Sequence, residues 1–439
     1  MLAPRSDEAS LPRIVEQEPN DSPEQAQLLV LNADWPVLTV DGSLAGPGQT
    51  NNRDVDVFKL VVPGGQPNGG AVAPSVDSAA EKDRGLARRL SLEIAPEGSS
   101  NLTLQLLDDG AKALATVAAD AGDRAGLPNM AVMPGRVYFF RVKALVKSAK
   151  AGADSLSVAI KYKLTVQLGD FEMGDEHEPN DAIATAESVV MLGPVELAGL
   201  HGWAHDQDVY RIAAPQVPSV VEVVLDSVKD VAPGLQVWDG QGAKLALARG
   251  RRGEPLALHN VLIPLGAADA GPASQFFYVV VRGEVGSNRT DRYVLHLAMG
   301  IPNAGAEVEP NDNPINATLV HDGVITGYLP MGDVDYFRYV GDGPADVTIE
   351  VASPAHVRPK VDVIRQRNGE TMASVEAQRA HQSVSLANLS TLGEPLLIRL
   401  TQGKGDGNAS EAYSLKISSA PTQLQKAGST NPSSPLNPN

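Results

Sequence analysis

The chain contains no cysteine, few aromatic residues and no long hydrophobic run. None of its 439 residues is Cys, and 4% are Phe, Trp or Tyr. The absence of cysteine excludes disulfides, thiolate nucleophiles and cysteine-ligated zinc. The longest apolar runs, such as residues 276–281, have the length of a strand and fall short of the roughly 18–20 residues of a membrane helix. We therefore expect no membrane insertion.

Basic charge is also scarce. Lys and Arg total 36 against 53 Asp and Glu, which gives a formal net charge of −17. A surface of this sign is repelled by the phosphates of nucleic acids and by anionic lipid. The composition therefore argues against a nucleic-acid partner and favours a cation-rich environment.

The common catalytic motifs are missing as well. The sequence has no His-Glu-x-x-His zinc motif, no Gly-x-Ser-x-Gly elbow and no P-loop. A Ser/His/Asp site assembled from distant residues would need a domain of its own, and the repeats described next leave no room for one. We expect a protein that is not an enzyme.

What the chain does contain is an acidic phrase, Glu-x-Glu-Pro-Asn-Asp, that occurs three times. The copies span residues 16–21, 176–181 and 307–312. An Asp-x-Asp pair follows each copy, ahead of an aromatic residue that we expect in the core: Phe58, Tyr210 or Phe337. A motif set repeated in the same order indicates repeated domains. Three domains of roughly 100–200 residues fit the length of the chain.

Apolar and polar residues alternate in many short segments. Each repeat closes on a Tyr-x-Leu segment, at residues 162–166, 293–297 and 413–417. Alternation of this period is typical of half-buried strands, and the 41 Gly and 32 Pro supply turns. We predict an all-β fold of three tandem jelly-roll-like β-sandwiches. The expected boundaries are a flexible leader at 1–15, sandwiches at 16–168, 169–299 and 300–419, and a disordered tail at 420–439.

The repeated carboxylates indicate a cation site in each domain. A residue before proline is extended, and residues two apart in an extended chain face the same side, so the two Glu of each phrase should project together. The Asn-Asp turn and the Asp-x-Asp pair add further oxygens. Such hard ligands suit Ca²⁺, which takes 6–8 oxygens. Without a cation, close carboxylates would repel by about 4 kcal/mol per pair at intermediate dielectric.

Simpler roles exist for parts of this pattern. Asp21, Asp181 and Asp312 could cap short helices, and a helix starting at residues 21–24 is the best helix candidate in the sequence. An Asp-x-Asp pair alone could be a solvated strand edge. The nearby His177 and His205 occur in the second repeat only. The recurrence of both acidic motifs in the same order favours the cation site.

This set of motifs resembles the bacterial pre-peptidase C-terminal domain, whose relatives include the collagen-binding domains of clostridial collagenases. The resemblance covers nearly the whole chain as three copies. It implies a jelly-roll sandwich in which calcium pins the N-terminal linker, with up to one Ca²⁺ per domain. The implied ligands are Glu16, Glu18, Asn20, Asp21, Asp54 and Asp56; Glu176, Glu178, Asn180, Asp181, Asp206 and Asp208; and Glu307, Glu309, Asn311, Asp312, Asp333 and Asp335.

Two functions follow from this resemblance. The first is a non-enzymatic, calcium-stabilised array of binding or spacer modules in a bacterial exported, cell-surface or periplasmic protein, with an unidentified protein or polysaccharide partner. Residues 1–8 do not read as a secretory signal, so export would require a leader upstream of Met1 or already removed. The second is an accessory region that targets a hydrolase to a polymer such as collagen or glycan. Trp35, Trp203 and Trp238 are its candidate contacts.

Overall fold

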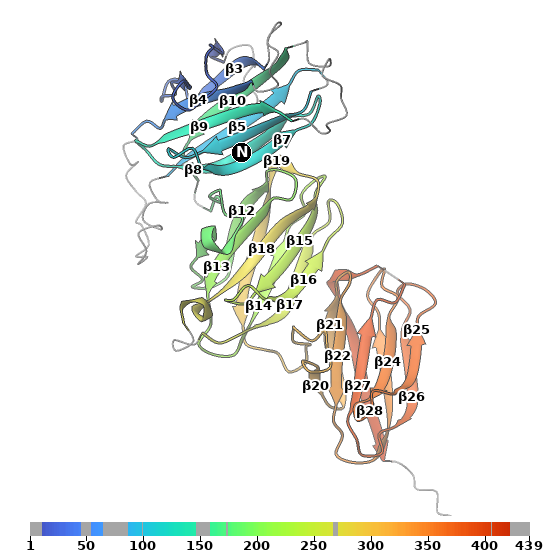
Figure 1. Ribbon diagram of the computed structural model, residues 1–439. Coiled ribbons are helices and arrows are strands. Elements are labelled where there is room, and N and C mark those ends of the chain that lie inside the picture. The colour runs from blue at the N-terminus through green and yellow to red at the C-terminus, as the bar shows by residue number, and fades with distance from the viewer. Residues whose placement is uncertain are drawn as a thin grey trace, which may run out of the picture. The chain divides into compact units, whose positions relative to one another are not determined.

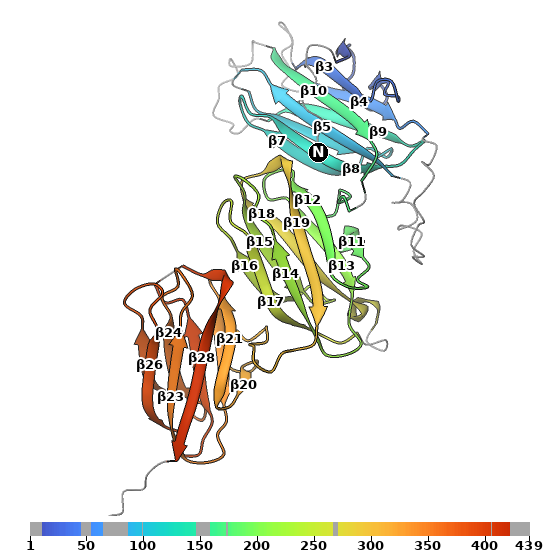
Figure 2. The ribbon, with the colours of Figure 1, turned by 180° about the vertical axis from the view of Figure 1, so that it is seen from behind.

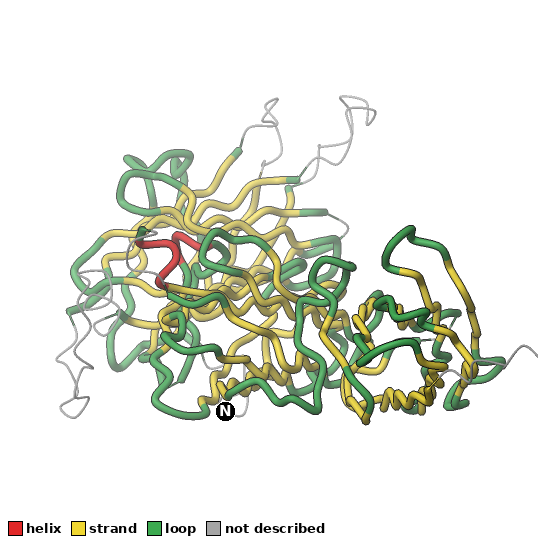
Figure 3. Tube along the Cα trace, turned by 90° about the horizontal axis from the view of Figure 1, so that it is seen from below, coloured by secondary structure: helices red, strands yellow, loops and turns green. Residues whose placement is uncertain are grey.

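The regular secondary structure of the computed structural model is almost entirely β-strand (Figure 3). It describes residues 11–44, 54–64, 87–98, 100–145, 159–172, 174–266, 271–404 and 406–421. Helix in this part of the chain is limited to two short 3-10 turns, η2 (Ile183–Thr185) and η4 (Pro272–Gln275). None of the helices described has the length and apolar character needed to cross a membrane. The alternating pattern of the sequence thus forms the predicted all-β fold.

The first sandwich packs two five-stranded sheets face to face (Figure 1). One sheet has the order β1-β3-β10-β5-β8 and the other β2-β4-β9-β6-β7. The strands are β1 (Arg13–Val15), β2 (Gln27–Leu29), β3 (Val37–Leu44), β4 (Val55–Val61), β5 (Arg88–Pro96), β6 (Leu102–Leu107), β7 (Ala113–Ala119), β8 (Ala125–Val132), β9 (Val137–Ala144) and β10 (Ile160–Gly169).

The second sandwich has a four-stranded and a five-stranded sheet. Their orders are β12-β19-β14-β17 and β11-β13-β18-β15-β16. The strands are β11 (Glu187–Val189), β12 (Val195–His201), β13 (Gln207–Ala213), β14 (Ser219–Leu225), β15 (Ala232–Trp238), β16 (Lys244–Arg249), β17 (Leu256–Ile263), β18 (Phe276–Val285) and β19 (Asn288–Gly300).

The third sandwich repeats this arrangement, and Figures 1 and 2 show its two sheets from opposite sides. The sheet orders are β21-β28-β23-β26 and β20-β22-β27-β24-β25. The strands are β20 (Thr318–Val320), β21 (Gly323–Leu329), β22 (Val334–Tyr339), β23 (Ala345–Ala352), β24 (Lys360–Arg365), β25 (Thr371–Glu376), β26 (Val384–Ser390), β27 (Leu396–Thr401) and β28 (Asn408–Pro421).

The three sandwiches share one topology, to which the first adds β1 at a sheet edge, so equivalent strands can be matched. The second Asp of each Asp-x-Asp pair lies on β4, β13 or β22. This strand always belongs to the sheet opposite the closing strand, which is β10, β19 or β28. Phe58, Tyr210 and Phe337 are at most 1% exposed. Their predicted place in the core is confirmed. An interior of buried Leu, Val, Ile and aromatic side chains fills the space between the two sheets.

Three expectations need correction. Strand β1 begins at Arg13, inside the expected leader, because it pairs in parallel with β3. Strand β28 reaches Pro421, inside the expected tail, because it pairs with β23 to its end. Residues 21–25 form a turn, closed by Gln25 N–H to Ser22 O at 3.0 Å, where a helix was predicted. Only one residue separates this turn from β2. The remaining leader and tail, 1–10 and 422–439, lie outside the described residues.

The chain divides into two compact units. Met1–Pro302 contains the first two sandwiches, and Asn303–Asn439 contains the third. The first unit is therefore larger than any single predicted domain, because its two sandwiches contact each other.

Candidate metal centres

Each acidic phrase crosses from one sheet of its sandwich to the other. In the second sandwich, Glu176 N–H donates to Ala198 O of β12 at 3.1 Å, and Asn180 O accepts from Val209 N–H of β13 at 3.2 Å. The same pair of bonds links Glu16 to Asp41 and Asn20 to Val57, and Glu307 to Thr326 and Asn311 to Tyr336. The phrase thereby bridges the two sheets along one edge of the sandwich, and its Glu-Pro peptide bond is cis in all three copies.

This path brings three carboxylates together at one edge of every sandwich. One oxygen from each of three side chains lies within 4.8 Å of the others. We call these groups the first acidic site (Glu16, Glu18, Asp56), the second acidic site (Glu176, Glu178, Asp208) and the third acidic site (Glu307, Glu309, Asp335). All members of the second and third sites are buried, whereas Glu18 is exposed. The predicted convergence of the two Glu with the last Asp is therefore present in the structure.

A tyrosine hydroxyl from the closing strand reaches across the sandwich to the Asp of each site. Tyr293 Oη donates to Asp208 Oδ2 at 2.7 Å, and Tyr413 Oη donates to Asp335 Oδ2 at 2.8 Å. Tyr162 makes the same bond to Asp56. These tyrosines are at most 1% exposed. They belong to the recurrent Tyr-x-Leu segment, whose alternation predicts a strand but does not indicate that the hydroxyl is part of the site.

Backbone amides bind the two Glu of each site. The first Glu accepts an N–H from the neighbouring strand: Leu200 N–H donates to Glu176 Oε1 at 2.8 Å, and Tyr328 N–H donates to Glu307 Oε1 at 2.5 Å. The second Glu accepts the N–H of the Asn in its own phrase, at 2.8–2.9 Å. These bonds fix the carboxylates, and Glu178 Oε1 is a buried oxygen without a hydrogen-bond partner.

A glycine makes room for this packing in every sandwich. A Cβ at Gly327 would lie 2.2 Å from Glu307 Oε2 and 2.4 Å from Tyr413 Oη. Gly42 and Gly199 occupy the equivalent positions against Tyr162 and Tyr293. A side chain here would displace the carboxylate or the tyrosine. The glycine recurs one residue before a bound N–H, and this repeat is the signal by which it could have been found.

Several buried polar atoms of the sites have no hydrogen-bond partner. They include Oδ1 of the site Asp in all three sandwiches and both amide atoms of the Asn in each phrase: Asp56, Asp208 and Asp335, and Asn20, Asn180 and Asn311. These Asn side chains are 0% exposed. Buried polar atoms in folded proteins are normally satisfied, so atoms of this kind indicate a bound ion or water.

Burial and mutual repulsion perturb the carboxyl groups. Burial raises the pKa of Asp56 to about 8 and that of Glu16 to about 6. Burial also raises the pKa of Asp208 to about 7. The pKa of Asp335 is raised well above its usual range, first by burial and then by the charge of Glu307. Carboxyl groups held this way favour either a proton or a cation at neutral pH.

The remaining predicted ligands surround these groups. Asp54, Asp206 and Asp333 stand immediately before β4, β13 and β22, and their charges raise the pKa of neighbouring site carboxyls. Asp21 and Asp312 are exposed and Asp181 is half-buried. Asp181 is no helix cap, because the residue capping η2 is Ala182 and no side chain bonds there. His177 pairs with Glu187 at 2.8 Å, and His205 is exposed in a turn.

The donor set fits calcium. Each site offers carboxylate oxygens from three side chains and an adjacent Asn amide with no partner. Oxygen-only sets of carboxylates and amides are what Ca²⁺ takes, whereas sulfur or several imidazoles would favour softer metals. A divalent cation would neutralise the buried charge and supply a partner to the unsatisfied oxygens. The first acidic site is the most exposed of the three.

Comparison with known proteins gives no assignment. No protein-family model and no curated protein matches the chain. The solved structure of PBSX exported protein XepA has 12% identity and a TM-score of 0.17, covering 59% of this chain and 84% of that one. Tripeptidyl peptidase 2 has 11% identity and a TM-score of 0.20, covering 90% and 24%. An archaeal virus protein with a triple jelly-roll fold has 8% identity and a TM-score of 0.16, covering 81% and 82%. Similarity this low carries no argument about function.

Proposed function

We propose that this chain is a non-enzymatic array of calcium-stabilised β-sandwich modules in an exported or cell-surface bacterial protein. On this proposal the modules are pre-peptidase C-terminal domains, and each of the three acidic sites binds one Ca²⁺. The observation that carries the proposal is the unsatisfied Oδ1 of a buried Asp beside two Glu, repeated in all three sandwiches. Clustered carboxylates of this kind destabilise a fold unless a cation neutralises them.

The role proposed for calcium is structural. An ion held by the phrase and by the strand of the opposite sheet would tie the linker to its sandwich and restrict its motion. Sites of the weak extracellular class bind calcium at concentrations found outside the cytosol, which supports an exported location.

Thermal melts of the full chain test this proposal. Addition of 2 mM CaCl₂ to chelator-treated protein should raise the melting temperature, because a ligand that binds only the folded state stabilises it. Magnesium at the same concentration should raise it less, because Mg²⁺ demands smaller octahedral sites and gives up water reluctantly. A melting temperature that does not respond to calcium would rule the proposal out.

A second candidate function is targeting of an associated hydrolase to a polymer. Trp35 favours it, because its side chain is 59% exposed and flat rings supply contact area at low entropy cost. The other two candidates do not present free rings: Trp203 packs on the core of the first sandwich, and Trp238 packs on a small buried cluster. Retention on insoluble collagen or glycan that Trp35→Ala abolishes and Leu192→Ala preserves would support this function. Equal retention of both variants and a control sandwich protein would count against it.

A further inference from the structure

A residue of the first sandwich enters the second acidic site. Asn129, on β8 of the first sandwich, donates from Nδ2 to Glu176 Oε1 at 3.0 Å. Its side chain is 4% exposed, and its backbone has a φ of 54°. The side-chain amide is therefore buried, with the backbone of β8 on one side and Glu176 on the other.

Backbone bonds hold the second Glu of the same site to the same strand. Glu178 N–H donates to Asn129 O at 3.0 Å, and Glu178 O accepts from Ala131 N–H at 2.7 Å. Glu178 thus adds one residue of parallel pairing to the edge of the first sandwich, opposite Met130. Two of the three residues of the second acidic site are consequently held by the first sandwich, Glu176 through its carboxylate and Glu178 through its backbone.

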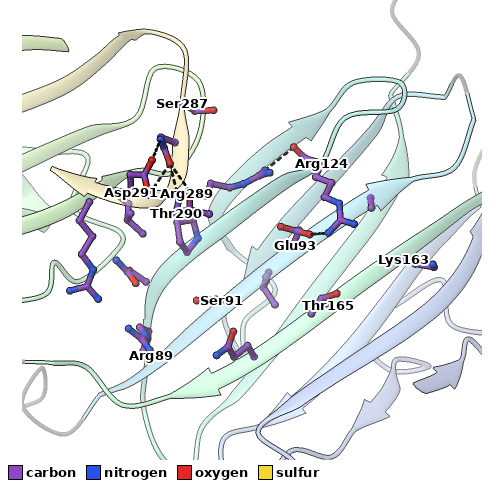
Figure 4. A pocket seen from close by; sticks show the side chains of 18 of the residues that line it. Arg89, Ser91, Glu93, Arg124, Lys163, Thr165, Ser287, Arg289, Thr290 and Asp291 are labelled. Carbon is purple, nitrogen blue, oxygen red and sulfur yellow. Dashed lines mark hydrogen bonds and ion pairs between the residues drawn. The ribbon is translucent and has the colours of Figure 1, made fainter. Parts of the chain in front are cut away.

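Further contacts surround this joint. The Trp203 ring packs against the core of the first sandwich. Pro128 lies so close to Gly202 that a Cβ on this glycine would be 2.7 Å from Pro128 Cγ. Arg289 Nη1 donates to Arg124 O at 2.8 Å, and Arg124 pairs with Glu93 at 2.7 Å (Figure 4). The contacts are spread over several elements, so they restrain rotation of one sandwich against the other as well as separation of the two.

The cleft beside the joint does not offer an obvious alternative role. It has a volume of about 1140 Å³ and is lined by charged and hydroxyl side chains of both sandwiches (Figure 4). Four of its five arginines form ion pairs, Arg13 with Asp41, Arg124 with Glu93, and Arg89 and Arg292 with Asp175, and Arg289 donates to the backbone carbonyl of Arg124. Charges satisfied within the protein strengthen the joint more directly than they attract a ligand.

We infer that cation binding at the second acidic site and docking of the first sandwich on the second are one coupled equilibrium, with Asn129 as the positioning residue that links them. An ion that orders Glu176 and Glu178 orders the groups that bind β8. By reciprocity, docking must raise the affinity for the ion by the same factor. The inference rests on the proposed function, since it requires the site to bind calcium.

Asn129→Gly tests the coupling with little backbone strain, because glycine tolerates the positive φ and removes only the amide side chain. The matched control is Asn388→Gly. Asn388 occupies the equivalent strand irregularity in β26, has a φ of 58° and is exposed. Both changes are made in a chain carrying Asp56→Asn and Asp335→Asn, so that the second acidic site alone keeps all three of its carboxylates.

Two measurements are read together. Calcium titration gives the affinity of the second acidic site, and spin labels on Lys112→Cys and Lys244→Cys give the distance between the two sandwiches. The chain has no cysteine of its own to interfere. We expect the distance distribution of the parent to narrow with calcium. Asn129→Gly should weaken calcium binding by about tenfold, as changes behind a metal ligand do, and should broaden the distribution at the same calcium concentration.

Asn388→Gly should match the parent in both measurements. Normal calcium binding with a distance distribution that calcium does not change would overturn this inference alone, as would an Asn129→Gly variant that binds calcium like the parent. Absence of calcium binding in the unmodified chain would overturn the proposed function and this inference together.

Discussion

At the scale of single residues, the acidic sites depend on groups that are not acidic. Tyr162, Tyr293 and Tyr413 donate to the buried Asp, and a glycine opens the space in which Glu and Tyr meet. A buried carboxylate is tolerated when hydrogen-bond donors of this kind stabilise its charge. Two substitutions separate the effect of space from the effect of charge.

The first substitution is Gly327→Ala. Its Cβ would collide with Glu307 and Tyr413, so we expect a loss of about 1–3 kcal/mol in the free energy of unfolding, which is the usual effect of overpacking. Calcium affinity at the third acidic site should fall as well. Gly343→Ala is the control, because a Cβ there meets nothing within 4 Å. Equal denaturation midpoints for the two variants would contradict this account of the glycine.

The second substitution is Asp335→Asn, which keeps the shape of the side chain and removes its charge. In calcium-free buffer at pH 8 we expect stabilisation of about 1–3 kcal/mol, because an incompletely satisfied buried charge is lost. In calcium the same variant should lose one ion per chain. Asp342→Asn, at an exposed position, should do neither. A calcium-free destabilisation by Asp335→Asn would show that the carboxylate is needed without an ion.

At the scale of secondary-structure elements, each acidic phrase joins two sheets that no strand joins directly. Its bonds to β12 and β13, or to β21 and β22, are few and lie at the edge of the sandwich. Local opening there requires much less disruption than opening the central strands. An ion at the acidic site would therefore act mainly on this local opening.

Hydrogen exchange measures that opening. With calcium at 100 times its dissociation constant, linkage adds about 2.7 kcal/mol, so exchange through openings that release the ion should slow about 100-fold. We expect this at Glu307 N–H and Tyr336 N–H, which bind Thr326 O and Asn311 O. The Gly369 N–H in the β24–β25 turn binds Arg365 O and should exchange at the same rate with and without calcium. Uniform slowing at all three amides would argue against a local effect of the ion.

The sequence predicted the elements better than the partners of the site. Alternation of apolar and polar residues located the closing strands, and the repeat of Glu-x-Glu-Pro-Asn-Asp located the converging carboxylates. The tyrosine hydroxyls were missed because Tyr in an alternating strand is equally typical of a core residue. Asn129 could not be found, because it acts once, in a neighbouring sandwich, and leaves no repeat. The helix expected after Asp21 was wrong because the short segment before β2 forms a turn.

At the scale of the whole molecule, three acidic sites contribute to a net charge of −17. Their carboxyl groups have raised pKa values in the metal-free protein, about 6 for Glu16 and about 8 for Asp56. Protons and calcium therefore compete for the same oxygens. This competition makes the stability of the chain depend on pH in opposite ways with and without the ion.

A carboxyl group whose pKa is higher in the folded state stabilises that state at low pH. The contribution is lost as the pH rises from about 4, the unfolded value, through the folded pKa. In calcium-free buffer we therefore expect the melting temperature to fall between pH 5 and pH 8. The increase in melting temperature caused by calcium should grow over the same interval. A calcium effect largest at pH 5 would contradict the assignment of these carboxyls as ligands.

Calorimetric titration of calcium into the chelator-treated full chain tests the central claim most directly. The three acidic sites predict three Ca²⁺ per chain, with the weakest binding at the first site, where Glu18 is exposed. The Asp335→Asn chain should bind two. Titrations that show no binding, or a stoichiometry that Asp335→Asn leaves unchanged, would contradict the claim that these repeated carboxylates are calcium sites.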